Sequence, residues 1–254
     1  MTTPSVPSGV FGVDIGGSGI KGAPVDLDRG ALAEPRHKVL TPHPASPEAV
    51  VAAVREVVEH FEHRGPVGLT FPGVVVDGHT RTAANVDQGW LGLDAEGLFR
   101  EALDSPAVLL NDADAAGLAE AAHGAGRDQG GVMLVLTFGT GIGSALFVDG
   151  ALVPNTELGH LELRGKDAER RASAGARERH QLTWAEWAVR VDEYLDLVER
   201  LFSPQLVIIG GGVSRKHEKF LPLLKERSAR VVPAELRNDA GIVGAAMAAA
   251  KYSR

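Results

Sequence analysis

Two glycine-rich turns between apolar, strand-like runs are the feature that most constrains the fold of this chain. The first lies in "VFGVDIGGSGIKGAPVD", residues 10–26, and the second in "LTFGTGIGSALFVDG", residues 136–150. Each segment reads as strand, turn and strand, and the two glycine clusters are 123 positions apart. The same device at the start of two half-chains is typical of a duplicated fold. The sequence therefore predicts two similar halves.

The first turn also has the G-x-G-x-x-G spacing of a dinucleotide-binding turn, at Gly17, Gly19 and Gly22. That fingerprint requires a helix directly after the turn and an acidic residue about 20 positions further on. Pro24 follows the last glycine, and the downstream region reads "PRHKVLTP" without an acid. Because proline interrupts a helix, we interpret this turn as a connection between two strands.

Strand-like and helix-like segments alternate along the chain, which predicts an α/β protein with mixed sheets in two lobes. A helix is expected from Pro47, capped by Ser46 and closed by Gly65. Further helices are expected at residues 91–105, 114–123 and 184–201, in the charged segment after Gly212, and at 241–251. We assign residues 9–112 to a small N-terminal lobe, completed by a C-terminal helix at 241–252, and residues 113–240 to a large lobe.

Composition excludes several classes of protein. The 254 residues include no cysteine, which excludes disulfides, thiolate zinc sites and a cysteine nucleophile, and agrees with a cytoplasmic location. The net charge of −7 argues against a general nucleic-acid binder. The longest apolar runs have the length of buried strands and are too short to span a membrane, and the polar start of the chain lacks a secretion signal.

The two glycine turns have the chemistry of phosphate sites. Glycine leaves backbone N–H groups open to phosphate oxygens without a side-chain clash. Either turn alone is explained equally well as a tight hairpin, but both carry hydroxyl side chains, and an acid and a lysine flank the first. The pair predicts a phosphate-binding cleft between the lobes, with these candidates: Asp14, Gly16, Gly17, Ser18, Gly19, Lys21, Thr137, Gly139, Thr140, Gly141 and Gly143.

Four motifs occur in order across nearly the whole chain: "DIGGSGIKG", "LTFGTGIGSALFVDG", "ELGH" and "VIIGGG". Together they resemble the ROK family of sugar kinases, within the actin-like ATPase superfamily. The resemblance implies a two-lobed actin-like ATPase (ribonuclease H-like) fold, with a duplicated mixed-sheet core and an interlobe cleft. It also implies a sugar as the substrate.

The resemblance assigns roles to individual residues. Asp112, in "LLNDADAAG", resembles the catalytic base that takes the proton of a sugar hydroxyl, although an Asp at a strand-to-helix junction is also often a helix cap. Asp14 resembles the residue that acts on magnesium through water. Glu169 resembles a sugar ligand of the family, but it could equally be a surface glutamate. The sugar-binding residues implied are Gly73, Asn85, Asn111, Asp112, Glu157, His160 and Glu169, and the donor or nucleotide side is Gly210, Gly211 and Gly212.

The chain departs from the family after the G-H motif, where most members carry a zinc loop with three cysteines. Here the segment reads "GHLELRGKDAERRASAGARERHQ", so zinc is not expected. Residues 164–180 contain six Lys or Arg against three acids, and residues 214–230 contain six against two. Each run could be a solvated helix face, but in an acidic protein both suit a polyanionic ligand. Candidate contacts are Lys166, Arg170 and Arg171.

One branch of the family resembles this chain more specifically: the polyphosphate glucokinases of actinobacteria. The resemblance lies in the cysteine-free segment and in "NVDQGWLG" and "LTWAEWAVRVDEYL". The resemblance implies transfer of the terminal phosphoryl group of inorganic polyphosphate to the 6-hydroxyl of glucose, giving glucose 6-phosphate. It also implies Mg²⁺ as a cofactor and a homodimer. An ATP-dependent glucokinase or glucomannokinase of the same fold is the alternative. A non-catalytic sugar sensor is a weaker one, because sensors of this family carry a helix-turn-helix domain, and only about nine residues precede the first expected strand.

Overall fold

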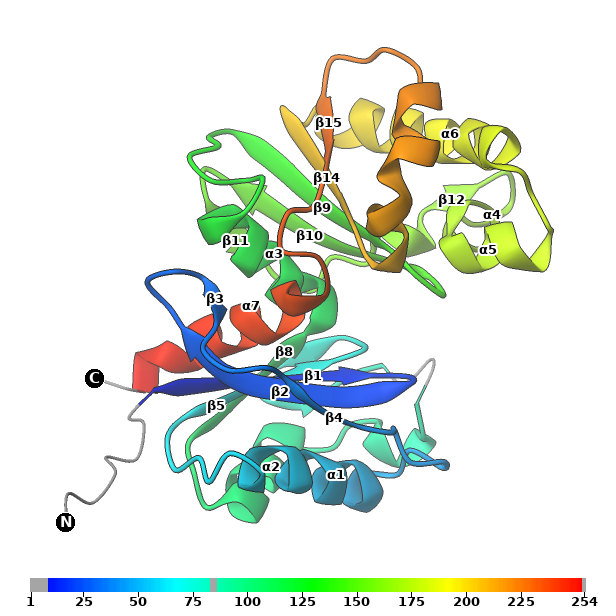
Figure 1. The fold of residues 1–254 in the computed structure, drawn as a ribbon. Helices are drawn as coiled ribbons and strands as arrows, with labels where there is room; N and C mark the ends of the chain where they lie inside the picture. The colour runs from blue at the N-terminus through cyan, green and yellow to red at the C-terminus, as the bar shows by residue number, and fades with distance from the viewer. Residues whose placement is uncertain (1–8, 83–85, 253–254) are drawn as a thin grey trace. The chain divides into compact units, whose positions relative to one another are not determined.

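The structure, a computed structural model, describes residues 9–82 and 86–252. The chain divides into two compact units, one from residues 1–119 and 239–254 and the other from residues 120–238. Each unit contains one large mixed sheet with helices against it (Figure 1). The lobe boundaries proposed from the sequence stay predictions. Among the described helices, none is both long enough and apolar enough to cross a membrane.

The sheet of the first unit has the strand order β3-β2-β1-β5-β8, and β4 pairs with β2. Strand β1 is antiparallel to β2 and parallel to β5, which is parallel to β8. A small two-stranded sheet of β6 and β7 lies outside this order. The strands are β1 (Val10–Gly16), β2 (Gly19–Asp26), β3 (Ala31–Leu32), β4 (His37–Val39), β5 (Val67–Phe71), β6 (Val75–Val76), β7 (His79–Thr80) and β8 (Ala107–Asn111).

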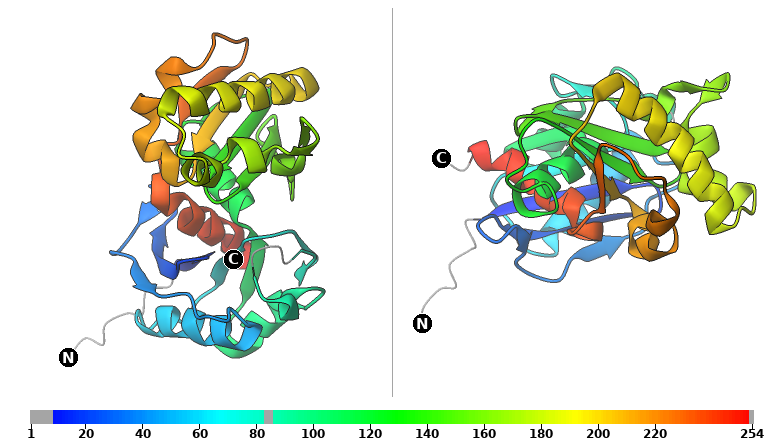
Figure 2. Two further views of the ribbon diagram at one scale, coloured as in Figure 1. Left: turned by 90° about the vertical axis from the view of Figure 1, so that its right-hand side faces the viewer. Right: turned by 90° about the horizontal axis from the view of Figure 1, so that it is seen from above.

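Helices cover both faces of this sheet (Figure 2). On one face, α7 approaches so closely that a Cβ at Gly12 or Gly68 would lie within 2 Å of an α7 carbonyl oxygen. On the other face, Phe11 packs in a buried core with Val54 of α1 and Phe99 of α2. Successive strand residues point to opposite faces, so Asp14 shares the α7 face with Gly12. The helices are α1 (Pro47–Glu59), α2 (Ala95–Leu103), α3 (Asp112–His123), which runs on into the second unit, and α7 (Ala240–Ala249).

The sheet of the second unit has the order β11-β10-β9-β14-β15, and β12 and β13 form a separate hairpin. Strands β9, β10 and β11 are antiparallel neighbours, and β14 and β15 extend the sheet in parallel from β9. This is the arrangement of the first sheet, so the predicted duplication is confirmed. The strands are β9 (Val132–Phe138), β10 (Ile142–Val148), β11 (Ala151–Val153), β12 (Glu162–Leu163), β13 (Lys166–Asp167), β14 (Leu206–Gly210) and β15 (Arg230–Pro233).

The core of the second unit contains a cluster of aromatic rings. Trp187 contacts Phe138 of β9 edge to face, at 5.9 Å between ring centroids, and Phe220 at 4.8 Å. Trp187 belongs to α6, and a capping box between Thr183 and Glu186 fixes the start of this helix. The helices are α4 (Glu169–Ala172), α5 (Ala174–Arg179) and α6 (Trp184–Phe202).

Several helices differ from the sequence prediction. Helix α2 begins at Ala95 and not at 91, because the Asp94 side chain caps it, and it ends at Leu103, before the left-handed Asp104. Helix α1 ends at Glu59 and not at Gly65, because the chain turns at Glu62, which is left-handed with φ of 51°. Helix α3 begins at Asp112, two residues early, because the Asn111 side chain caps it. The charged segment after Gly211 is not an α-helix but two 3₁₀ segments, interrupted at Lys216. The 3₁₀ segments are η1 (Gln88–Trp90), η2 (Leu158–His160), η3 (Gly212–Lys219), η4 (Leu221–Leu223), η5 (Arg237–Asp239) and η6 (Ala250–Tyr252).

Candidate functional site

The first glycine turn closes the β1–β2 hairpin, in which Gly16 and Gly19 are paired and Gly17 and Ser18 are exposed at the tip. The Thr41 hydroxyl donates a hydrogen bond to the Gly16 carbonyl and holds the base of the turn. The Lys38 side chain lies over Gly19, where a Cβ would come 2.1 Å from its Cε. Lys38 was not predicted. The sequence indicates only that Lys38 lies in a short strand-like run, "HKVLT". It does not indicate that this strand pairs with β2.

Asp14 is the polar centre of the α7 face. Its Oδ1 accepts a hydrogen bond from the Thr70 hydroxyl at 3.0 Å, and its Oδ2 forms an ion pair with Lys21 Nζ at 2.9 Å. A Cβ at Gly241, in the first turn of α7, would lie 3.1 Å from the Asp14 carboxyl carbon, so the carboxylate sits at the positive end of this helix. Thr70 was not predicted, although a lone hydroxyl in a buried apolar strand is a readable signal.

The surroundings of Asp14 are compatible with Mg²⁺. Both carboxylate oxygens already have a protein partner, Thr70 or Lys21. Mg²⁺ sheds its water reluctantly and is commonly held by one or two carboxylates together with substrate phosphates. The donor set suits an ion that contacts Asp14 through water, which is the role that the family resemblance implies. The role itself stays a prediction.

Asn111 and Asp112 stand where β8 meets α3. The Asn111 Oδ1 accepts hydrogen bonds from the backbone N–H groups of Ala113 and Asp114, at 2.8 and 3.1 Å, and its Nδ2 donates to the Gly73 carbonyl at 3.1 Å. Asn111 is therefore the principal helix cap, and one of its amide hydrogens has no acceptor among residues 9–82 and 86–252. Asp112 is partly buried and accepts a hydrogen bond from Ala113 N at 2.8 Å. Asn85 lies outside the described residues.

The second glycine turn joins β9 to β10 and is braced by its neighbours in the second unit. Gly139 N donates to the Gly141 carbonyl at 3.0 Å, and Gly175 N donates to the Gly139 carbonyl at 2.9 Å. The Glu169 carboxylate lies on the turn: its Oε2 accepts from Ile142 N at 3.2 Å, and a Cβ at Gly141 would come 2.2 Å from that oxygen. Thr137 and Gly143 are paired at the base of the turn, and Thr140 is exposed.

The turn after β14 lies next to this one. Gly210 is paired with Thr137 of β9. Gly211 has φ of 76° and ψ of −178°, a conformation open essentially to glycine alone. A Cβ on Gly211 would lie 2.5 Å from the Phe138 carbonyl oxygen. The structure therefore brings the predicted donor-side glycines Gly210–Gly212 beside the predicted phosphate turn.

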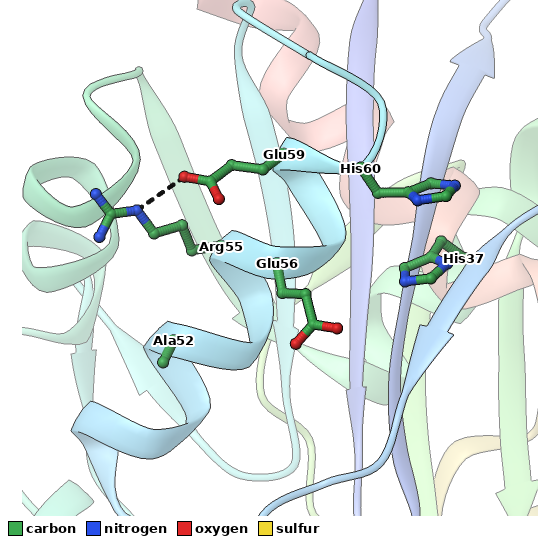
Figure 3. Close-up of a pocket in the computed structure, with 6 residues that line it drawn as sticks. All are labelled: His37, Ala52, Arg55, Glu56, Glu59 and His60. Carbon is green, nitrogen blue, oxygen red and sulfur yellow. Dashed lines mark ion pairs between the residues drawn. The ribbon is translucent and has the colours of Figure 1, made fainter.

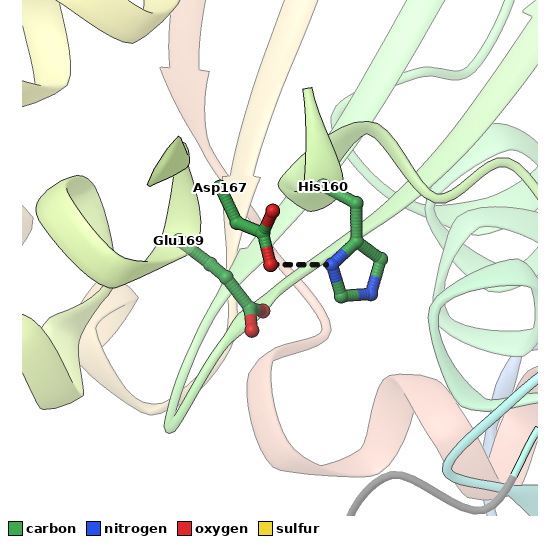
Figure 4. Close-up of side chains that lie close together, drawn as sticks. All are labelled: His160, Asp167 and Glu169. Carbon is green, nitrogen blue, oxygen red and sulfur yellow. Dashed lines mark hydrogen bonds and ion pairs between the residues drawn. The ribbon is translucent and has the colours of Figure 1, made fainter. Parts of the chain in front are cut away.

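Three acidic side chains surround one imidazole in the second unit. The His160 Nδ1 lies 3.4 Å from Asp167 Oδ2 (Figure 4). Its Nε2 lies 3.7 Å from Glu157 Oε2. Ligand atoms of His160, Asp167 and Glu169 all lie within 4.8 Å of one another. Burial raises the pKa of Glu157, the nearby Glu169 raises it further, and His160 opposes this shift. Glu157, His160 and Glu169 were predicted to act together, whereas Asp167 was not.

The predicted polyphosphate contacts differ in their availability. Arg171 is half-buried and donates to Glu193 Oε2 at 2.6 Å, an interaction that lowers the pKa of Glu193. Arg170 has an exposed side chain, 3.9 Å from Asp167, and Lys166 is exposed.

The second basic run contributes less free charge than its sequence indicates. Arg227 is almost fully buried and forms ion pairs with Asp192, Asp196 and Glu199, and Lys225 pairs with Asp196. These contacts tie the chain before β15 to α6, so this part of the run is structural.

A separate open pocket of about 490 Å³ lies on the first unit between α1 and β4. The rings of His37 and His60 stack there, with 3.9 Å between centroids, and Arg55 pairs with Glu59 at 3.1 Å (Figure 3). None of the predicted site residues that the structure describes lines this pocket. The pocket therefore does not coincide with the predicted site.

Comparisons with known proteins identify the family of the chain. The profile of the ROK family matches residues 10–178. The chain is 54% identical, over 239 residues, to the polyphosphate glucokinase of Mycobacterium tuberculosis (strain CDC 1551 / Oshkosh), which covers 94% of this chain and 90% of that protein.

Solved structures show the same fold. An inorganic polyphosphate/ATP-glucomannokinase from Arthrobacter sp. strain KM superposes with a TM-score of 0.92 at 52% identity, covering 96% of this chain and 98% of that one. A ROK family glucokinase from Streptomyces griseus, in complex with glucose and AMPPNP, gives a TM-score of 0.77 at 25% identity, over 95% and 99%. The actin-like ATPase fold predicted from the sequence is confirmed, and the chain belongs to the ROK family.

Proposed function

We propose that this protein is a polyphosphate-dependent glucokinase, which moves the terminal phosphoryl group of inorganic polyphosphate to the 6-hydroxyl of glucose. The observation that carries the proposal is the 54% identity to a polyphosphate glucokinase over 94% of this chain. The geometry supports it, because an acid stands at the start of α3, a lysine and an acid flank a glycine turn, and an imidazole lies among carboxylates.

In the proposed reaction, the 6-hydroxyl oxygen of glucose attacks the terminal phosphorus, and the bond from that phosphorus to the bridging oxygen breaks. Asp112 accepts the hydroxyl proton, and polyphosphate leaves one phosphate shorter. Asn111 keeps the β8–α3 junction rigid, which fixes the backbone that carries Asp112.

Sugar binding is assigned to Gly73, Asn85, Asn111, Glu157, His160 and Glu169, whose oxygen and nitrogen atoms suit hydroxyl groups. Lys21 and the backbone N–H groups of the two glycine turns neutralise charge on the transferred group. Mg²⁺, held near Asp14 through water, would supply further positive charge to the phosphates.

The location, the oligomeric state and the metal requirement are part of the same proposal. We propose a cytoplasmic protein, which the absence of cysteine from the sequence supports. We propose a homodimer and a requirement for Mg²⁺; the first rests on the family resemblance, and the second also on the donor set at Asp14.

ATP is the second candidate donor. The solved glucomannokinase is named for both polyphosphate and ATP, and the glucokinase from Streptomyces griseus was solved with AMPPNP. The turn at Gly210–Gly212, which resembles an adenosine-side motif, is present beside the second phosphate turn. An ATP-dependent glucokinase or glucomannokinase therefore remains the alternative to test.

The experiment is a pair of initial-rate assays with glucose, one with polyphosphate freed of ATP and one with ATP freed of polyphosphate. We expect glucose 6-phosphate to form with polyphosphate alone, at a higher kcat/KM than with ATP. Formation with ATP only would contradict the assignment of the donor. Repeating both assays with mannose measures the selectivity for the sugar.

A further inference from the structure

The side chain of Asp167 faces the imidazole of a predicted sugar ligand. Its Oδ2 lies 3.4 Å from His160 Nδ1 (Figure 4), whereas the other ring nitrogen, Nε2, lies 3.7 Å from Glu157 Oε2. A carboxylate accepts only, so the proton in this contact belongs to His160 Nδ1. The other ring nitrogen, Nε2, then faces Glu157.

The backbone of Asp167 is fixed by a very short hairpin. Strands β12 and β13 pair Glu162 with Asp167 and are joined by Arg164 and Gly165, both left-handed with φ of 56° and 76°. Two left-handed residues in a two-residue connection are the signature of a type I′ turn, which sets the register of the flanking strands.

The chain on either side of the hairpin is anchored as well. Ala168 is fully buried, and its N–H donates to the Leu161 carbonyl at 2.8 Å. Leu161 directly follows the 3₁₀ turn that carries His160. Asp167 and His160 are thus held at the two ends of one closed loop, so their separation does not depend on a flexible surface segment.

We infer that Asp167 is a positioning residue for sugar binding: it orients the His160 ring so that Nε2 faces the sugar. The inference rests on the proposed function, because it takes His160 as a sugar ligand. A histidine whose second nitrogen is held by a carboxylate presents its first nitrogen in one fixed orientation. Asp167 itself does not contact the sugar.

A competing role for Asp167 is visible in the same cluster. Its Oδ2 also lies 3.9 Å from Arg170 Nε, and Arg170 is a candidate polyphosphate contact. The two roles affect different substrates. Loss of a residue that orients His160 raises the KM for glucose, whereas loss of a residue that orients Arg170 raises the KM for polyphosphate.

The test compares Asp167→Ala, Asp167→Asn and the matched control Glu162→Gln, a charge-removing change at an exposed residue of the same hairpin. Losing one hydrogen bond to a charged group corresponds to about a tenfold change. We expect Asp167→Ala to raise the KM for glucose about tenfold with kcat and the polyphosphate KM little changed. Asp167→Asn keeps an acceptor and should recover part of the loss, and Glu162→Gln should match the wild type.

A second readout does not depend on activity. In ¹⁵N-histidine-labelled protein, the resonances of His160 should show a protonated Nδ1 in the wild type, and a redistributed proton in Asp167→Ala. The inference is overturned if folded Asp167→Ala keeps the wild-type glucose KM, or if only its polyphosphate KM rises. A wild-type protein that phosphorylates glucose with neither donor would contradict the proposed function instead, while the NMR experiment would still report on the His160–Asp167 pair.

Discussion

Asp14 and Lys21 are directly opposite each other across the β1–β2 hairpin, and their side chains form an ion pair of 2.9 Å beside the first glycine turn. The pair places one acid and one cation at a turn whose backbone N–H groups suit phosphate. Lys21 is about a quarter exposed, so its ammonium group can still reach a ligand.

Replacing Lys21 by Ala should therefore slow phosphoryl transfer. Removing one preorganised charge-stabilising donor commonly lowers kcat by about 10²- to 10³-fold. Steady-state rates with polyphosphate measure the effect. Arg29→Ala, which removes an exposed cation from the turn after β2, is the matched control and should leave the rate unchanged. A Lys21→Ala rate within twofold of the wild type would remove Lys21 from the role.

Replacing Asp112 by Asn should abolish most of the turnover while glucose still binds. A positioned general base contributes roughly 10²- to 10⁴-fold to the rate, so kcat should fall by that factor. Glucose binding, followed by calorimetry, should change little. Asp104→Asn makes the same chemical change at an exposed residue that caps the end of α2, and should keep full activity. Near-normal kcat in Asp112→Asn would exclude it as the base.

Gly211→Ala should destabilise the second unit more than Gly150→Ala does. Both glycines are left-handed, but an added Cβ meets backbone oxygen at 2.5 Å at Gly211 and open space at Gly150. Left-handed strain alone costs of the order of 1–3 kcal/mol. Thermal unfolding should therefore show a larger drop in Tm for Gly211→Ala. Equal drops would mean that the contact with Phe138 relaxes without cost.

Glu157→Gln should make the protein more stable at neutral pH than the wild type, with a smaller difference at pH 4. Burial raises the pKa of Glu157 above its ordinary value of 4.5, so the native state holds the proton more tightly than the unfolded state. The resulting stability is present below the ordinary pKa and is lost as the pH rises through the raised pKa. Denaturant unfolding at both pH values measures the difference. A difference that grows towards pH 4 would contradict the sign.

Replacing Arg170 and Arg171 by Ala, one at a time, should change different properties of the protein. Arg170 is exposed, so Arg170→Ala should raise the KM for polyphosphate, with a larger effect on long chains and little effect on ATP. Arg171 pairs with Glu193 at 2.6 Å, so Arg171→Ala should lower the free energy of unfolding, by about 1 kcal/mol for a partly buried pair. Equal effects of Arg170→Ala on both donors would contradict a specific contact with polyphosphate.

Local patterns in the sequence predict much of the fold and part of the site. The strand–turn–strand pattern predicts that Asp14 and Lys21 flank the first turn and that the chain has two similar halves. Long-range contacts are not readable in this way. Arg227 reads as part of a charged, solvated run, yet it is buried against Asp192, 35 positions away in α6. The position of Asp167 beside His160 depends on a tight turn in which Arg164 is left-handed. An arginine in the sequence does not predict that conformation.

The most direct test of the central claim is the donor comparison with purified protein, glucose and Mg²⁺. We predict formation of glucose 6-phosphate from polyphosphate in the complete absence of ATP, with a higher kcat/KM for polyphosphate than for ATP. Phosphorylation of glucose by ATP alone, with no product from polyphosphate of any chain length, would contradict the account.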